Sequence, residues 1–152
     1  MLRVRLKLHR NGKCEALASP LENLSEVVSI GLAQARTHSH DRFLFHKTTR
    51  RELYERELAH AQARGWFDAI FINERGEVTE GCRSNVIIKH NGEYFTPPLA
   101  CGLLPGVYRG HILATQSLPV REKIFFREEL EAAEEVWVCN ALRGLMWVKL
   151  HN

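Results

Sequence analysis

Residues 67–109 read FDAIFINERGEVTEGCRSNVIIKHNGEYFTPPLACGLLPGVYR, and this stretch decides the fold. Its first seven residues predict a mostly apolar strand. After a Glu-Arg-Gly-Glu turn, the run Val78–Gly81 brings the carboxylate of Glu80 to a strand end just before a glycine. Asn91-Gly92 then predicts a tight hairpin between two further strands. The stretch therefore predicts antiparallel strands that carry one acid at an edge.

The same stretch ends in a turn that leads into a helix. Leu103-Leu104-Pro105-Gly106 precedes residues 107–116, whose apolar side chains have helical spacing. The start of a helix presents free backbone N–H groups beside the glycine, and this arrangement holds an anion such as a phosphate. A Pro-Gly turn into a helix also forms without any ligand, so the turn alone leaves both interpretations open.

One lysine upstream completes this stretch. Lys47 lies in FLFHKTTRR, residues 43–51, where the apolar residues 43–45 predict a short edge that places Lys47 at a strand end. Its aromatic and histidine neighbours predict partly apolar surroundings, which disfavour the ammonium form and favour imine chemistry.

The rest of the chain predicts one α/β domain behind a hairpin. Leu2, Val4, Leu6 and Leu8 alternate with charged residues, and Asn11-Gly12 turns the chain into a partner strand over residues 13–18, which predicts a hairpin with one wet face. Residues 19–24 are typical of a linker. Further strands are predicted over residues 27–33, 119–126, 135–139 and 144–150, and Val120, Ile124 and Phe126 share one face of the second.

Helices are predicted over residues 50–64 and 127–133. The first is capped by Thr48 or Thr49 and has Tyr54, Leu58 and Ala61 on one side.

Composition excludes several classes of function. The net charge of +3 is mild and its basic residues are interspersed with acids, which argues against a nucleic-acid partner. No apolar run reaches the ~20 residues that a membrane span needs, and the N-terminus alternates charged and apolar residues, so we expect no membrane association and a cytoplasmic location.

The potential metal ligands are scattered. His38 and His40 lie two residues apart in a polar loop over residues 36–42, and without a nearby third ligand they favour a solvated loop over a metal site. The four cysteines are far apart and form no C-x-x-C motif, which favours reduced thiols over a disulfide framework or a zinc site. We therefore expect no bound metal.

These residues together resemble a known family. Lys47, Val78-Thr79-Glu80-Gly81, Ser84-Asn85-Val86, residues 94–98 (YFTPP) and residues 103–110 (LLPGVYRG) are similar to the motifs of fold-type IV pyridoxal-phosphate (PLP) enzymes, the class IV aminotransferases. Branched-chain aminotransferases, D-amino-acid aminotransferases and aminodeoxychorismate lyases belong to that family. The separation of 33 residues between Lys47 and Glu80 suits it. The run 138–142 looks most like the lyases, and the run 140–144 looks like the lyase modules fused behind aminodeoxychorismate synthase.

The resemblance implies a fold and a set of roles. It implies an α/β (α+β) fold like the large domain of D-amino-acid aminotransferase, with a mixed sheet or pseudo-barrel and flanking helices, over residues 25–152. Residues 1–24 would be a hairpin remnant of the small N-terminal domain and a linker. Lys47 would be the covalent anchor of PLP and its general base and acid, Glu80 would face the pyridine nitrogen, and the phosphate would be held by Gly106, Val107, Tyr108, Asn140 and Ala141.

The implied activity is a PLP-dependent β-elimination. Aminodeoxychorismate would lose pyruvate and give 4-aminobenzoate, a step of folate synthesis. The alternatives are a D-amino-acid or branched-chain aminotransferase, and a non-catalytic relative that binds only PLP or a partner subunit. Many relatives carry a tyrosine shortly after the lysine, and here only Tyr54 is available, if the helix register allows it. The implied partners are a second copy of the chain or the fused synthase.

Overall fold

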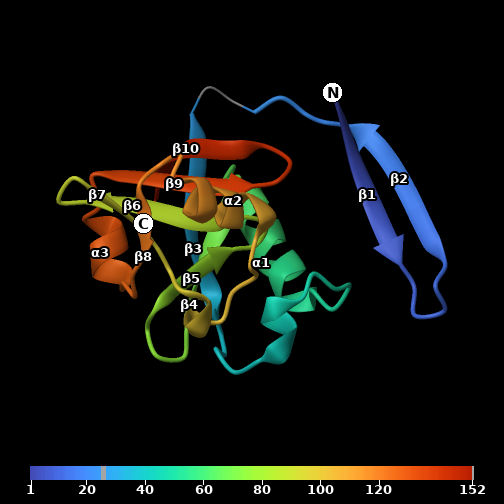
Figure 1. Cartoon of the computed structure of the whole chain (residues 1–152), viewed down its shortest axis with the longest axis horizontal. Helices are drawn as coiled ribbons and strands as arrows, with labels where there is room; N and C mark the ends of the chain where they lie inside the picture. Colours follow the sequence, from blue (N-terminus) through green and yellow to red (C-terminus); the bar gives the residue numbers. More distant parts are fainter. Residues whose placement is uncertain (25–26, 152) are drawn as a thin grey trace.

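The computed structural model describes residues 1–24 and 27–151. Figure 1 shows a rounded body, and a long hairpin that projects from it at one side. The boundary predicted at residues 24 and 25 adjoins the two residues that lie outside the description.

The body is a closed barrel of six strands. In spatial order these are β5 (Val78–Gly81), β4 (Asp68–Asn73), β3 (Val28–Thr37), β10 (Gly144–Leu150), β9 (Glu135–Asn140) and β6 (Asn85–His90), and a β5–β6 pairing closes the ring. The sheet is mixed, because β3 runs parallel to β4 and to β10 while the other barrel pairs are antiparallel. Two short strands, β7 (Glu93–Thr96) and β8 (Val120–Glu122), extend the sheet beyond β6. The predicted fold class is confirmed.

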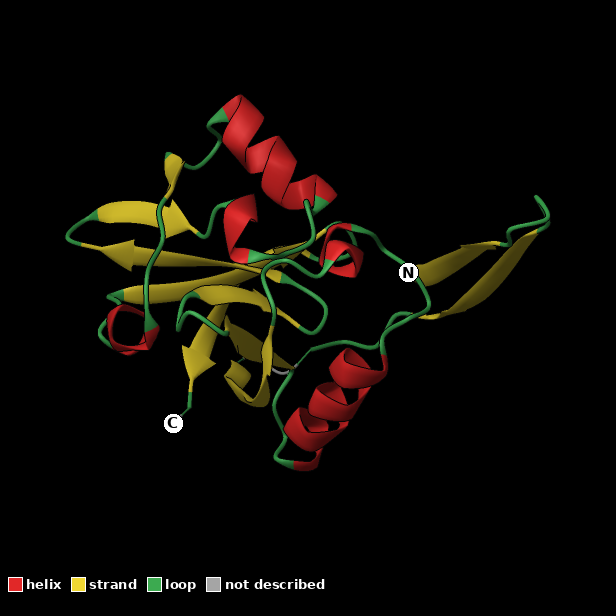
Figure 2. Ribbon diagram, turned by 90° about the horizontal axis from the view of Figure 1, so that it is seen from below, coloured by secondary structure: helices red, strands yellow, loops and turns green. Residues whose placement is uncertain are grey.

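Helices cover the outside of the barrel, as the view in Figure 2 shows. They are α1 (Glu52–Ala63), α2 (Val107–Thr115) and the short α3 (Arg127–Glu131), with single turns η1 (Arg42–Phe45) and η2 (Leu99–Cys101). Both faces of strand β4 are covered, which explains its almost continuously apolar sequence. Ile70 packs inside the barrel, while Ala69 and Phe71 pack against α1 on the other face.

The N-terminal hairpin pairs β1 (Leu2–Leu8) with β2 (Cys14–Pro20), as predicted. Its apolar face is formed by Leu2, Val4, Leu6 and Leu8, which are between 60% and 78% exposed. The prediction of only one wet face is therefore wrong for the described chain, since both faces of this two-stranded sheet are exposed.

Residues 43–45 do not form the predicted strand edge. They belong to η1, because the Asp41 carboxylate accepts a hydrogen bond from the Phe43 N–H (2.9 Å) and starts a helical turn. Thr48 and Thr49 do not cap α1 either. Arg51 is the N-cap and makes no side-chain capping bond, while the Thr48 hydroxyl accepts from the Arg50 N–H (3.2 Å).

The predicted strand over residues 119–126 is also too long, and its burial differs. Strand β8 ends at Glu122, and Phe125 is fully buried while Ile124 and Phe126 are exposed. The backbone explains this, because the Phe125 carbonyl accepts a hydrogen bond from the Val78 N–H (2.9 Å), which turns the Phe125 side chain into the barrel core.

Candidate active site

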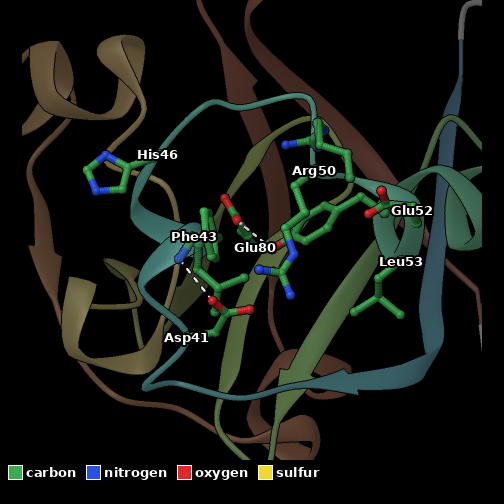
Figure 3. A pocket seen from close by; sticks show the side chains of 10 residues that line it. Asp41, Phe43, His46, Arg50, Glu52, Leu53 and Glu80 are labelled. Atoms are coloured by element: carbon green, nitrogen blue, oxygen red, sulfur yellow. Dashed lines mark hydrogen bonds between the residues drawn. The ribbon is translucent and has the colours of Figure 1, made fainter. Parts of the chain in front are cut away.

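The centre of the site is Glu80, on β5. Its side chain is 5% exposed, and one carboxylate oxygen accepts a hydrogen bond from the Tyr54 hydroxyl (2.9 Å; Figure 3). Burial raises the pKa of Glu80 to about 8, against the opposing hydrogen bonds of the Tyr54 hydroxyl and the Leu104 backbone. No carboxylate–cation pair of the described residues includes Glu80. The Glu80 side chain is thus shielded from water and has no salt-bridge partner among the described residues.

Tyr54 is held in place from two sides. Its ring lies 4.7 Å from that of Phe71 between centroids, and the Arg51 guanidinium lies 4.5 Å from the Tyr54 centroid. Arg51 also donates a hydrogen bond to the Cys82 carbonyl, which ties the start of α1 to the end of β5. Burial raises the pKa of Tyr54, so its hydroxyl stays a hydrogen-bond donor at neutral pH. The helix register therefore brings this phenol to Glu80.

Asn85, at the start of β6, connects Glu80 to the turn before α2. Its side-chain amide donates to the Leu104 carbonyl (3.0 Å) and lies 3.5 Å from a Glu80 carboxylate oxygen. The Glu80–Asn85 backbone pair also closes the barrel. Sequence reasoning quoted Asn85 within a motif but gave it no role.

The turn before α2 has the predicted form. Gly106 is the N-cap of α2 and makes no side-chain capping bond, and Val107 is 79% exposed. The first N–H groups of a helix have no partner within the helix, so this end can accept an anion. A Cβ atom on Gly106 would lie 2.0 Å from the Asn85 side-chain oxygen, so the close approach of Asn85 requires a glycine at this position.

The turn between β9 and β10 lies beside α2. A Cβ atom on Gly144 would lie 3.3 Å from the Tyr108 hydroxyl, which shows how closely the two segments pack. The Asn140 carbonyl oxygen of the side chain accepts from the Leu142 N–H (3.1 Å) and the Arg143 N–H (2.9 Å), while its amide donates to the Arg83 carbonyl (3.3 Å). The Asn140 side chain therefore shapes the turn, and Ala141 is exposed.

Lys47 lies in the segment between η1 and α1, and its side chain is exposed. The partly apolar surroundings predicted for Lys47 are not formed by the described residues. Its neighbours His46 and Arg50 line a cavity of about 210 Å³ that also reaches Tyr54 and Glu80. In Figure 3 the residues of the η1 side lie opposite those of the α1 side, with Glu80 between them: Asp41, Phe43 and His46, against Arg50, Glu52 and Leu53.

The predicted site residues thus form one linked set around Glu80 and α2, while Lys47 lies on a separate segment. Asn85 joins Glu80 to the Gly106 turn, and Tyr108 joins that turn to the segment that carries Asn140 and Ala141. The segment that carries Lys47 borders the cavity, although the Lys47 side chain itself is not among the lining residues. The roles of all these residues stay predictions.

Other sites are not formed within the described ranges. His38 and His40 are exposed, and residues 1–24 and 27–151 hold no group of three or more His, Cys, Asp or Glu side chains placed for a metal ion. In the same ranges, no helix has the length and apolar character to cross a membrane.

Comparison with known proteins identifies the family. The model of the amino-transferase class IV family matches residues 3–150, and the chain belongs to this family. It is 28% identical over 148 residues to a putative aminodeoxychorismate lyase from Schizosaccharomyces pombe, covering 94% of this chain and 64% of the relative. It is 30% identical over 98 residues to a probable branched-chain-amino-acid aminotransferase from Thermotoga maritima, covering 62% of this chain and 36% of the relative. The chain therefore spans only part of the length of these relatives.

A solved structure is similar throughout. The crystal structure of a putative amino-acid aminotransferase from Mesorhizobium loti superimposes with a TM-score of 0.90 at 38% identity, covering 99% of this chain and 73% of that one. This similarity confirms the mixed barrel as the fold of fold-type IV enzymes.

The enzymes of this family depend on PLP, and the residues present fit that cofactor. PLP has a ring nitrogen and, on the other side of the molecule, a phosphate. Protonation of the ring nitrogen makes the ring a better electron acceptor. Glu80 offers a buried carboxylate without a salt bridge, and the start of α2 offers uncapped N–H groups. The Asn85 side chain contacts both Glu80 and the turn before α2, so complementary groups for the two ends of the cofactor lie on adjoining elements.

Proposed function

We propose that this chain carries the large domain of a PLP-dependent aminodeoxychorismate lyase, which releases pyruvate from 4-amino-4-deoxychorismate and leaves 4-aminobenzoate. The observation that carries the proposal is the buried pair of Glu80 and Tyr54 beside the start of α2, which supplies the acid for the ring nitrogen next to an anion-holding turn. The lyase from Schizosaccharomyces pombe supports the choice of reaction, because its similarity extends over 94% of this chain.

Bound PLP supplies an electron sink for the bond that breaks at the substrate carbon next to the amino group. Glu80 keeps a proton on the ring nitrogen, and the dry surroundings of its carboxylate strengthen that interaction. Tyr54 fixes the orientation of the carboxylate by donating to it. Val107 and Tyr108 bind the phosphate through backbone N–H groups, together with the turn at Asn140 and Ala141. Gly106 contributes the close approach of the turn, since its own N–H donates to the Leu104 carbonyl (2.8 Å).

Lys47 has two roles in this proposal. Its Nζ atom would hold the cofactor covalently, and it would be released when the substrate amine takes its place. The freed Nζ would accept the proton from the ring carbon that bears the amino group, and the neighbouring ring C–O bond would break as the ring becomes aromatic. The departing enolate would take up the proton from Nζ and become pyruvate. For these roles the loop between η1 and α1 must turn the Lys47 side chain toward the cavity. The nearby residues His46 and Arg50 already line this cavity.

The remaining substrate-binding groups are proposed to come from a second copy of the chain or from a fused aminodeoxychorismate synthase. The cavity of about 210 Å³ is bounded by η1 and the start of α1, and its lining mixes Asp41 and Glu52 with Arg50 and Arg51. Both arginines already make contacts within the chain, Arg50 with the Phe43 ring (4.4 Å) and Arg51 with the Tyr54 ring (4.5 Å) and the Cys82 carbonyl.

An amino-acid aminotransferase is the second candidate. It is favoured by the Mesorhizobium loti protein, a putative amino-acid aminotransferase that is 38% identical to this chain. Lys47, Glu80 and the Gly106 turn would have the same roles, but a second half-reaction with a keto acid would regenerate the cofactor.

The test supplies PLP and aminodeoxychorismate without any keto acid, and measures pyruvate and 4-aminobenzoate. Formation of both in equal amounts supports the lyase. Amino-group transfer to an added keto acid with no pyruvate from aminodeoxychorismate supports the aminotransferase. If the chain binds PLP and neither reaction occurs, also after the synthase is added, it is a non-catalytic relative. Glu80→Gln serves as the control that keeps the fold and loses turnover.

A further inference from the structure

Asn85 occupies an unusual place in the barrel. It is the first residue of β6, its side chain is 4% exposed, and its backbone pairs with Glu80 where the barrel closes. A buried side-chain amide must use its hydrogen-bonding groups, because an unsatisfied one costs about 1 to 3 kcal/mol. The hydrogen-bond partners of the Asn85 amide therefore indicate its role.

The amide nitrogen of Asn85 faces two acceptors that belong to different elements. One is the Leu104 carbonyl at 3.0 Å, in the turn before α2, and the other is a Glu80 carboxylate oxygen at 3.5 Å, on β5. An amide NH₂ has two donors, so one nitrogen can serve both. The carboxylate and the turn are thereby tied to a single side chain.

The amide oxygen of Asn85 fixes the same turn by close packing. A Cβ atom on Gly106 would lie 2.0 Å from this oxygen, much closer than any real contact. The φ of Gly106 is −61°, which every residue type can adopt, so its lack of a side chain is needed for the approach of Asn85 and not for the backbone conformation.

We propose that Asn85 is a positioning residue of the PLP site, which fixes the position of the Glu80 carboxylate relative to the first N–H groups of α2. This inference rests on the proposed function, since PLP is a rigid molecule whose ring nitrogen and phosphate must meet both groups at once. Preorganisation within about 0.5 Å is what such a site requires. Asn85 touches neither reacting atoms nor, in this account, the cofactor itself.

The first experiment measures the affinity of the whole chain for PLP and for pyridoxal, which lacks the phosphate, by titration of the bound chromophore. In Asn85→Ala we expect PLP to bind about 10- to 100-fold more weakly. The preference for PLP over pyridoxal should also shrink, because the start of α2 is no longer held in register with Glu80. Glu80→Gln should weaken both ligands alike and keep that preference.

Thr96→Val is the matched control. The Thr96 hydroxyl is fully buried and donates to the Val86 carbonyl of β6 (2.8 Å), so its removal also costs one buried side-chain hydrogen bond, and this bond involves neither Glu80 nor the turn before α2. At a comparable loss of melting temperature, Thr96→Val should keep the PLP affinity within about threefold. Equal losses of affinity in Thr96→Val and Asn85→Ala would mean that Asn85 acts only through stability, and would overturn the inference.

The second experiment needs no cofactor. Gly106→Ala should lower the melting temperature, because its methyl group meets the Asn85 oxygen. When both substitutions are combined, the melting temperature should fall by less than the sum of the two single losses, because Asn85→Ala removes that clash. Additive losses in the double variant would overturn the close coupling of the two residues. A wild-type chain that binds no PLP overturns the proposed function and this inference together. Binding that is unchanged by Asn85→Ala overturns the inference alone.

Discussion

The hydroxyl of Tyr54 donates a hydrogen bond of 2.9 Å to the carboxylate of Glu80, although 26 residues separate them. This bond links the outer helix α1 to the strand that closes the barrel. The acid that the family motif places at a strand end therefore has a phenol as its main partner.

Tyr54→Phe tests the bond directly. Loss of a donor to a buried acceptor should lower the free energy of unfolding by roughly 1 kcal/mol, and should weaken PLP because the Glu80 anion loses a stabilising partner. The pKa of Glu80 should rise further, so raising the pH should recover part of the PLP affinity. Chemical unfolding and a PLP titration at several pH values measure this.

Tyr94→Phe is the control for Tyr54→Phe. The Tyr94 hydroxyl also donates to a carboxylate, that of Glu135 (3.2 Å), but at a partly buried position outside the site. This variant should leave PLP affinity unchanged at every pH. A pH-dependent loss in Tyr94→Phe of the same size would show that Tyr54 has no special connection to the cofactor.

Glu80 should make stability depend on pH. Burial raises the pKa of Glu80 from its ordinary value of 4.5 to about 8, so the folded state binds more protons than the unfolded state between these two values. The contribution of Glu80 is fully present below pH 4.5 and is lost as the pH rises through about 8. Wild type should therefore lose stability over this window relative to Glu80→Gln, by roughly 1 to 4 kcal/mol. Asp68 is buried too, and burial also raises its pKa, but it is common to both chains. Parallel stability curves would contradict the raised pKa.

The exposed hairpin should contribute little to the barrel. Leu6 is 67% exposed, so Leu6→Lys should change the free energy of unfolding of the body by no more than the ~0.5 kcal/mol typical of surface substitutions. Val86→Ala is the contrasting variant, because Val86 is fully buried in the barrel core, and we expect a loss of about 1 to 3 kcal/mol. A large loss in Leu6→Lys would show that the apolar face of the hairpin is packed in solution.

The sequence predicted what depends on local signals. Asn91 and Gly92 have positive φ values of 51° and 76° between β6 and β7, which is the hairpin that this dipeptide favours. The end of β5 at Gly81 and the start of α2 after Gly106 were predicted for similar reasons. The family and the barrel class were recognised from motifs and not from periodicity.

The parts that were wrong or missed depend on distant or competing contacts. The turn η1 forms because a short side chain, that of Asp41, caps it, and this outweighs the apolar run that predicted a strand. Phe125 is buried because its carbonyl is paired with Val78 in another part of the chain. Asn85 was missed because its partners, Glu80 and Leu104, come together only when the barrel closes.

The central claim is that Lys47 is the covalent anchor of PLP in a site built around Glu80. The most direct measurement is to incubate the chain with PLP, reduce it with borohydride and map the modified peptides by mass spectrometry. Lys13, exposed in the hairpin and paired with Glu15 (3.4 Å), provides the control variant Lys13→Ala. The account predicts one PLP per chain, on Lys47, retained in Lys13→Ala and lost in Lys47→Ala. Modification spread over several lysines, or unchanged in Lys47→Ala, would contradict it.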